Sequence, residues 1–243
     1  IDPGATLTIK NEISMPTNGK FVVKPGGTLI IDGGKLTNTC CENFWHGIFV
    51  EGNYYENQQP DANGNYKQGR LILKNNAIIQ HAREAIRTKG SDGQFRTGGI
   101  IQATDAKIIN CRRAVEFLKY QNFGPNNSTL PNQSYFKRCH FEWNNNYLID
   151  LDEDTQTALV TLWDVHGVKF EACTFASRGT VQDGLKRGRA IYALDAAINI
   201  TGYCHLNLPN CNVVESEFKG FHTAIQLSGS GLSGSKIKNC FFD

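Results

Sequence analysis

The stretch that decides the fold is GRLILKNNAIIQHAREAI, residues 69–86. Short apolar segments alternate in it with turn residues, and Ile79 is followed six and seven positions later by Ala85 and Ile86. The same spacing recurs downstream in three more pairs: Ile108 with Ala114–Val115, Phe141 with Tyr147–Leu148, and Phe218 with Ala224–Ile225. Four copies of one spacing indicate an internal repeat.

A second pattern overlaps the first, because a small residue lies two positions before a phenylalanine. This occurs at Cys139 and Phe141, Cys173 and Phe175, Ser216 and Phe218, and Cys240 and Phe242. Residues two positions apart point to the same face of a β-strand. The anchors Ile79, Ile108, Phe141, Phe175, Phe218 and Phe242 are 29, 33, 34, 43 and 24 residues apart. Coils of ~22–25 residues, some with inserted loops, are typical of a parallel β-solenoid.

The region before residue 70 has short apolar strands separated by paired glycines, as in GKFVVKPGGTLIIDGGKLT (19–37) and WHGIFVEG (45–52). With residues 69–86, these segments resemble the right-handed parallel β-helix repeats of large secreted and surface proteins of Bacteroidetes-type bacteria. The resemblance extends from about Thr6 to Phe242 and implies an all-β, right-handed parallel β-helix. We expect one such domain over residues 1–243, Gly-rich up to about residue 70 and with Asn, Cys and Phe ladders from 70 to 243.

The composition of the chain argues against two classes of protein, those that bind nucleic acid and those that span a membrane. The chain has 243 residues, 25 basic against 23 acidic side chains and a net charge of +2, which is not typical of a nucleic-acid-binding protein. No apolar run approaches the ~20 residues that a membrane-spanning helix requires, so we expect no membrane span. The chain starts at Ile1 and stops within a repeat unit, so we expect it to be a piece of a longer protein, with other domains of that parent chain as partners.

Inserted loops are predicted to leave the solenoid mostly from one corner. The insertions assigned to that corner are Thr88 to Thr97, Lys119 to Ser134, Asp152 to Thr157, Ser228 to Ser235 and, less directly, Asn53 to Gln68. The insertion Ala176 to Arg189 interrupts a different corner. Loops stacked along one edge of a solenoid often form its binding surface, although long insertions are also tolerated without a function.

Two of these loops are rich in aromatic residues. The candidate ligand-binding side chains are Tyr54, Tyr55 and Tyr66 in the first loop, and Tyr120 and Phe123 in the second. Aromatic rings offer apolar area with a polar handle, which suits stacking on sugar rings or contact with a protein partner. The alternative is that these rings fold down and seal the flank of the solenoid.

The eight cysteines are dispersed and form no Cys-x-x-Cys pair, so no zinc site is expected. Cys204 and Cys211 are the pair most suited to a disulfide, because the short segment between them contains Pro209 and could fold back. The other cysteines are expected to be small buried apolar residues.

Asparagines recur near turns, at Asn75–Asn76, Asn110, Asn144–Asn146 and Asn239. Asn tolerates left-handed backbone geometry and can hydrogen-bond along a stack. We interpret them as a turn ladder that repeats at the same turn of successive coils, and not as a ligand site.

Residues suited to chemistry are few, and we assign no catalytic residue and no metal ligand. The run Asp150, Asp152 and Asp154 could offer oxygen ligands to Ca²⁺. We otherwise expect no cofactor. Parallel β-helix enzymes that cleave acidic polysaccharides combine carboxylates with a basic residue. Residues of that kind are Arg178, Lys186, Arg187 and Arg189, with Asp164, Asp183 and Asp195.

These patterns favour a non-enzymatic module that is extracellular or on the cell surface, an adhesin-like or stalk segment that binds glycan or protein through its loops. One alternative is a carbohydrate-active enzyme, a polysaccharide lyase or hydrolase, with its site near Ala176 to Arg189 or the acidic run. Another is a structural spacer or the cargo of an export system such as type IX secretion. The expected partners are polysaccharide, a surface protein or secretion machinery, and no nucleic acid.

Overall fold

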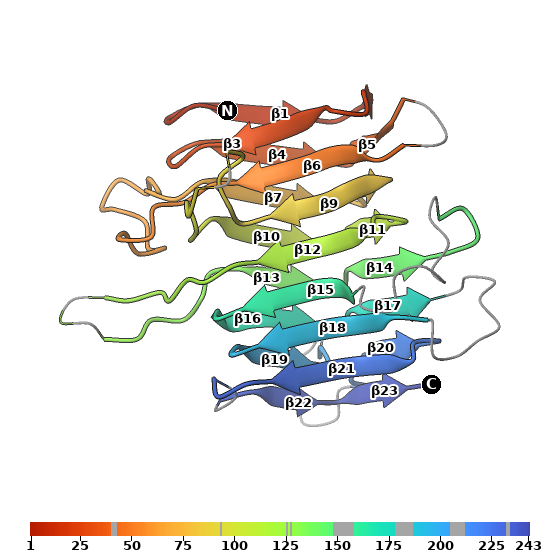
Figure 1. Ribbon diagram of the computed structural model, residues 1–243. Helices are drawn as coiled ribbons and strands as arrows, with labels where there is room; N and C mark the ends of the chain where they lie inside the picture. The colour runs from red at the N-terminus through yellow and green to blue at the C-terminus, as the bar shows by residue number, and fades with distance from the viewer. Residues whose placement is uncertain are drawn as a thin grey trace.

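The computed structural model describes residues 1–39, 43–92, 94–124, 126, 128–147, 158–177, 187–204, 212–231 and 234–243. Their regular structure consists of 23 β-strands in three sheets, each entirely parallel. The chain visits the three sheets in turn and then begins the next coil, so that the coils stack from the N-terminus at one end to the C-terminus at the other (Figure 1). This architecture is an all-β, right-handed parallel β-helix, as the sequence predicts.

We name the sheets A, B and C in the order in which a coil visits them. Sheet A consists of β1 (Thr6–Ile9), β4 (Thr28–Asp32), β7 (Arg70–Lys74), β10 (Ile100–Thr104), β13 (Tyr135–Lys137), β16 (His166–Glu171), β19 (Ala197–Thr201) and β22 (Lys236–Lys238). Sheet B consists of β2 (Glu12–Met15), β5 (Lys35–Asn38), β8 (Ile78–Gln80), β11 (Lys107–Ile109), β14 (His140–Trp143), β17 (Thr174–Ser177), β20 (Ser216–Lys219) and β23 (Cys240–Phe242). Sheet C consists of β3 (Lys20–Val23), β6 (Trp45–Val50), β9 (Ala82–Arg87), β12 (Arg113–Phe117), β15 (Ala158–Trp163), β18 (Arg189–Leu194) and β21 (Thr223–Ser228).

The six predicted anchors form one inward ladder in sheet B. They pair in register in the order Ile79, Ile108, Phe141, Phe175, Phe218 and Phe242. Phe175 is fully buried, and its ring stacks on Phe141 at 4.8 Å and on Phe218 at 4.7 Å between centroids. Because each coil covers the ladder residue of the next, stacking supplies the core that a single coil cannot make.

The small residues before these phenylalanines turn the chain from sheet A to sheet B. Cys139, Cys173 and Ser216 are buried at this corner. The residue before Cys139 and before Cys173 has a positive φ, 50° at both Arg138 and Ala172. A single residue in left-handed geometry redirects the chain, and the small side chain that follows fits inside the corner.

One pair of the predicted repeat is assigned to the wrong residues. In sheet C, Val115 pairs with Ile86 and with Val160, so the pair Leu159–Val160 occupies the position assigned to Tyr147–Leu148. Tyr147 instead follows β14 and packs half-buried against the core, and Leu148 lies outside the described residues. The insertion 144–157 lengthens this coil between sheets B and C, which moves the true pair further along the chain.

The asparagines belong to two corners and not to one. Asn75, Asn76 and Asn239 have positive φ between sheets A and B, whereas Asn110 has positive φ between sheets B and C. Asn110 donates a side-chain hydrogen bond of 2.7 Å to Oδ1 of Asn144 in the next coil. Hydrogen bonding along the stack is therefore present at both corners, because Nδ2 of Asn75 also donates to Oδ1 of Asp32 in the preceding coil, at 2.6 Å.

Insertions gather at the corner between sheets C and A, where residues 51–69, 88–99, 118–134 and 229–235 connect the strands. The insertion from Ala176 to Arg189 lies at another corner, between sheets B and C, as predicted. The insertion that contains Asp152 to Thr157 was assigned to the wrong corner, because it connects β14 of sheet B with β15 of sheet C. In the part of the chain that the structure describes, no helix could cross a membrane.

Candidate functional site: the loop edge between sheets C and A

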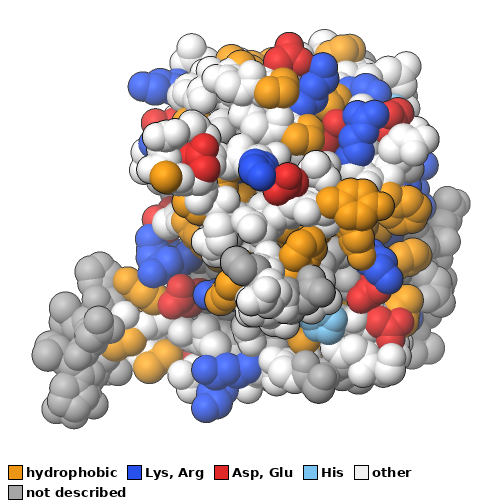
Figure 2. All heavy atoms as spheres, turned by 90° about the vertical axis from the view of Figure 1, so that its left-hand side faces the viewer, with side chains coloured by type: hydrophobic (Ala, Val, Ile, Leu, Met, Phe, Trp, Pro, Cys, Tyr) orange, Lys and Arg blue, Asp and Glu red, His pale blue; other side chains and the backbone are white. Residues whose placement is uncertain are grey.

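Three long loops, 51–69, 88–99 and 118–134, leave the solenoid from consecutive coils on one side (Figure 1). We call them together the loop edge. Figure 2 looks onto this side and shows hydrophobic side chains in small clusters among both acidic and basic ones. Charge of a single sign therefore does not dominate the surface, and a ligand would meet apolar and polar groups together.

A buried glutamine organises the first loop. The Gln68 side chain has no exposed surface, and its Oε1 accepts a hydrogen bond of 2.7 Å from the Asn53 amide. Its Nε2 donates to the carbonyl oxygens of Asn53 and Glu56, at 2.9 and 2.6 Å. Burying unpaired backbone groups is costly, and this amide side chain from the end of the loop satisfies three of them at its start. Gln68 therefore holds the two ends of the loop together.

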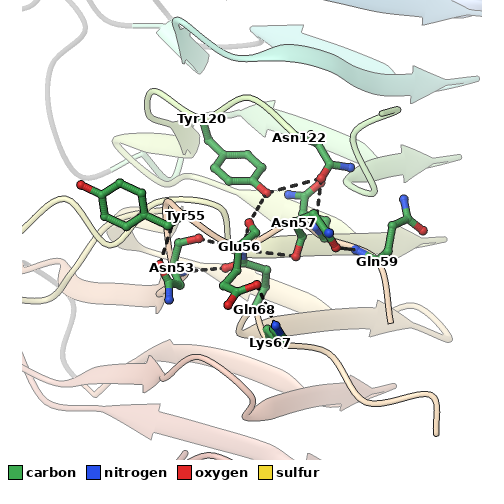
Figure 3. Close-up of polar contacts among 10 residues, drawn as sticks. Asn53, Tyr55, Glu56, Asn57, Gln59, Lys67, Gln68, Tyr120 and Asn122 are labelled. Carbon is green, nitrogen blue, oxygen red and sulfur yellow. Dashed lines mark hydrogen bonds and ion pairs between the residues drawn. The ribbon is translucent and has the colours of Figure 1, made fainter. Parts of the chain in front are cut away.

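A second buried glutamine joins all three loops. Gln58 is 1 % exposed, and its Nε2 donates to the Gly98 carbonyl oxygen at 3.1 Å. Its Oε1 accepts from the Gln133 amide at 2.9 Å, and its own amide donates to Oδ1 of Asn122 at 2.9 Å. Figure 3 shows the part of this network around Asn122 and Tyr120. The loops thus form one connected, hydrogen-bonded body.

An ion pair fixes the loop 88–99 to the end of β6. Glu51 is 1 % exposed, and its carboxylate accepts hydrogen bonds of 3.0 Å from the Ser91 amide and from Nη1 of Arg96. The hydrogen bond that Arg96 donates to Glu51 is the main reason why the pKa of Arg96 is raised. In addition, the Gly52 amide donates to the Arg96 carbonyl oxygen at 2.7 Å, which joins the first two loops through their backbones.

The five predicted ligand-binding side chains differ in exposure. Tyr55 is 82 % exposed and points away from the network in Figure 3. The ring centroid of the half-buried Tyr54 lies 5.5 Å from that of Tyr55 and 6.4 Å from that of Tyr120. Tyr120 is 2 % exposed, its hydroxyl donates to the Glu56 carbonyl oxygen at 2.7 Å, and burial raises its pKa. Tyr120 therefore supports the loops, whereas Tyr55 presents its ring to solvent.

The other two predicted side chains are half-buried. The Tyr66 ring lies under the guanidinium of Arg70, whose Cζ is 3.9 Å from the ring centroid. Phe123 bridges Thr129 in an antiparallel pair where the third loop folds back on itself. Tyr66 therefore packs against Arg70 at the end of its loop, and the backbone of Phe123 helps to close the third loop.

Sequence reasoning missed one exposed ring and the amides that fix the loops. Phe95, in the second loop, is 72 % exposed, and Nζ of Lys89 lies 5.8 Å from its ring centroid. A single phenylalanine in a polar loop gives no pattern that distinguishes it from a buried one. Nor does the sequence distinguish Gln58 and Gln68, which are buried, from the exposed amides around them.

The edge also contains a hollow of about 340 Å³ beneath the third loop. Its lining includes the side chains of Thr129, Leu130 and His166, together with Gly167 and Ala197. Polar and aliphatic groups therefore line this hollow together.

The cysteines agree with the prediction where the structure describes them. Cys111, Cys139 and Cys173 are buried free thiols, and Cys240 is half-buried. Burial raises the pKa of Cys111 to about 12, which keeps this thiol neutral and unreactive. Cys204 is disulfide-bonded, but Cys211 lies outside the described residues, so the pairing of these two stays a prediction.

Most residues of the enzyme alternative lie outside the described residues, namely Asp150, Asp152, Asp154, Arg178, Asp183 and Lys186. Of the remainder, Asp164 and Asp195 turn the chain from sheet C to sheet A with positive φ of 46° and 50°. Asp164 is paired with Nζ of Lys119 at 2.8 Å, and Oδ1 of Asp195 accepts from the Ser230 amide at 2.7 Å. Both aspartates therefore stabilise turns.

Within the described ranges, no group of three or more His, Cys, Asp or Glu side chains could hold a metal ion. The chain matches no protein-family model, and comparison with curated proteins and with solved structures found no match either. The architecture and the loop edge are therefore the basis for a functional proposal.

Proposed function

We propose that this chain is a non-enzymatic β-helical module of a secreted or cell-surface protein, and that it binds glycan through the loop edge. The resemblance to the Bacteroidetes-type repeats motivates the class of protein. The observation that carries the binding role is the exposure of Tyr55 and Phe95 on loops that a buried hydrogen-bond network holds rigid.

Rigid presentation of exposed rings is what distinguishes a binding edge from tolerated insertions. A mobile loop would lose conformational entropy when it binds, whereas a preformed one does not. Insertions without a function have no need to bury Gln58 and Gln68 or to fix Glu51 against Arg96.

Glycan is favoured over a protein partner by the composition of the surface. A sugar has an apolar ring face and a rim of hydroxyls, which matches two exposed rings with amide side chains beside them. A stable protein interface usually buries ~1,200–2,000 Å² around a central apolar cluster. The edge offers small hydrophobic clusters divided by charges (Figure 2).

An extracellular or surface location is supported by Cys204. This residue is disulfide-bonded, and disulfides persist mainly in oxidising compartments.

The test is binding to a panel of neutral and acidic polysaccharides, measured by affinity electrophoresis and calorimetry. We expect at least one polysaccharide to bind the natural chain, and the double variant Tyr55→Ser/Phe95→Ser to bind it about tenfold to a hundredfold more weakly. The control is Phe241→Ser, which removes a ring that is 47 % exposed on β23 of sheet B. Unchanged affinity in the double variant, or no binding to any polysaccharide, would contradict the proposal.

A further inference from the structure

A second hollow, of about 330 Å³, lies on the outer face of sheet A and not at the loop edge. It is lined by Lys169 and Glu171 of β16, Asn199 and Thr201 of β19, and Lys236 of β22. The strands are in register here, so that Lys169, Asn199 and Lys236 form one row along the solenoid axis. Glu171, Thr201 and Lys238 form the neighbouring row.

The hollow has an excess of positive charge. Glu171, the one carboxylate among the described lining residues, lies 3.7 Å from Nζ of Lys137. That ammonium is itself 3.6 Å from the centroid of the Tyr203 ring. Lys169 and Lys236 have no ion-pair partner among the residues that the structure describes. An anion that entered the hollow would therefore meet two uncompensated ammonium groups.

Neutral hydrogen-bonding groups lie near the two lysines, with Asn199 between them and Thr201 in the neighbouring row. The side chains of Asn199 and Thr201 are half-buried and make no hydrogen bond to another described residue. An amide and a hydroxyl can donate to a carboxylate or sulfate and can also bond to sugar hydroxyls. We infer that this hollow binds an acidic polysaccharide, with a carboxylate or sulfate group held between Lys169 and Lys236.

The spacing of charge favours a polysaccharide over a nucleic acid. Lys169 and Lys236 are two strands apart, which separates their backbones by about 10 Å. A nucleic acid carries one phosphate per ~3.4 Å of each strand and needs a dense row of cations. Here the Asn199 amide lies between the two lysines, and the Glu171 carboxylate lies in the neighbouring row. The carboxylate would repel a polymer with closely spaced negative charges.

The same surface is poorly suited to an acidic peptide. Extended peptides commonly bind by adding a strand to an open sheet edge. Both neighbours of β19 are already paired with it, since β16 lies on one side and β22 on the other. A peptide on this face would have side-chain contacts alone.

The test compares two double variants with the same change in charge. Lys169→Gln/Lys236→Gln removes the lysines of the hollow, and Lys10→Gln/Lys107→Gln removes two exposed lysines elsewhere. The probes are polygalacturonate for carboxylate, dextran sulfate for sulfate and dextran as the neutral polymer. We expect one of the acidic polymers to bind, with affinity at least tenfold lower for the first variant and unchanged for the second, and no such difference with dextran.

Equal weakening in both variants would overturn the inference, since it would indicate general charge attraction. Binding of poly-glutamate or of a single-stranded oligonucleotide as tight as that of the polysaccharide would overturn it too, as would no binding of either acidic polymer. The Tyr55→Ser/Phe95→Ser variant separates this site from the loop edge. It should keep its affinity at the hollow whether or not the edge binds glycan.

Discussion

The stacked phenylalanines of sheet B make the fold testable by one substitution, Phe175→Ala. Phe175 has no exposed surface and lies between two parallel rings, Phe141 and Phe218, each inclined to it by 5°. Truncation of a buried phenylalanine costs about 3–5 kcal/mol. Because the rings above and below are held by their own coils and cannot close the gap, we expect about 4 kcal/mol here.

Two matched substitutions in the last coil set the scale. Phe242 continues the same stack, 5.0 Å from Phe218, but is 51 % exposed, so Phe242→Ala should cost about 1–2 kcal/mol. Phe241 points to the other face and is 47 % exposed, so Phe241→Ala should cost less than about 1 kcal/mol. The inward ladder therefore predicts an order of effects and not only one value.

The assay is equilibrium urea unfolding, followed by the fluorescence of the buried Trp45 and Trp143 and by circular dichroism. Hydrogen exchange of β14, β17 and β20 locates the loss, because a solenoid coil is stabilised mainly by its neighbours. If Phe175→Ala cost no more than Phe241→Ala, the register of sheet B would be wrong.

Three further predictions follow from particular contacts. Gly47→Ala should destabilise the protein by at least about 2 kcal/mol more than Gly64→Ala in urea unfolding. Both glycines have positive φ, but only at Gly47 would a Cβ overlap a backbone atom, the Glu84 carbonyl oxygen. Equal losses of stability in the two variants would contradict this packing. Gln58→Ala should lower the free energy of unfolding by about 2–4 kcal/mol and speed proteolysis within residues 88–99 and 118–134, because it leaves the Gly98 carbonyl and the Gln133 amide unpaired. Gln59→Ala, which removes a side chain from the same loop, should change neither the stability nor the rate of proteolysis. Identical behaviour of the two variants would refute the network. Asp105→Asn should lower stability at pH 7, and its difference from the natural chain should shrink as the pH falls below about 4. The hydrogen bond from Arg138 lowers the pKa of Asp105 below its unfolded value, so the stabilisation is complete above the unfolded pKa and is lost as the pH falls through the folded pKa. A difference that does not depend on pH in titrated urea unfolding would exclude this pair as the cause.

The fold was predictable because its signal is repeated. The anchor position of sheet B is occupied by an aliphatic or aromatic residue in each coil from Ile79 to Phe242, so the six anchors repeat one signal six times. The assignment of Tyr147–Leu148 was wrong for an equally physical reason. A fixed spacing assumes turns of constant length, and the insertion 144–157 breaks that assumption in a single coil.

The loop edge was predictable only in outline. Its place follows from the lengths of the insertions, since residues 51–69, 88–99 and 118–134 all connect sheet C to sheet A. The exposure of its rings does not follow, because it depends on tertiary contacts of neighbouring loops. Tyr55 and Tyr120 are both tyrosines in polar loops, yet the first is 82 % exposed and the second 2 %.

The proposed module must bind glycan and leave it uncleaved. The most direct measurement incubates the purified chain with the same neutral and acidic polysaccharides and records, in one sample, the bound fraction, new reducing ends and absorbance from unsaturated uronates. We predict saturable binding of at least one polysaccharide, with reducing ends and absorbance equal to those of the sample without protein. Release of products in proportion to the amount of chain would contradict the account and establish the polysaccharide lyase or hydrolase in its place.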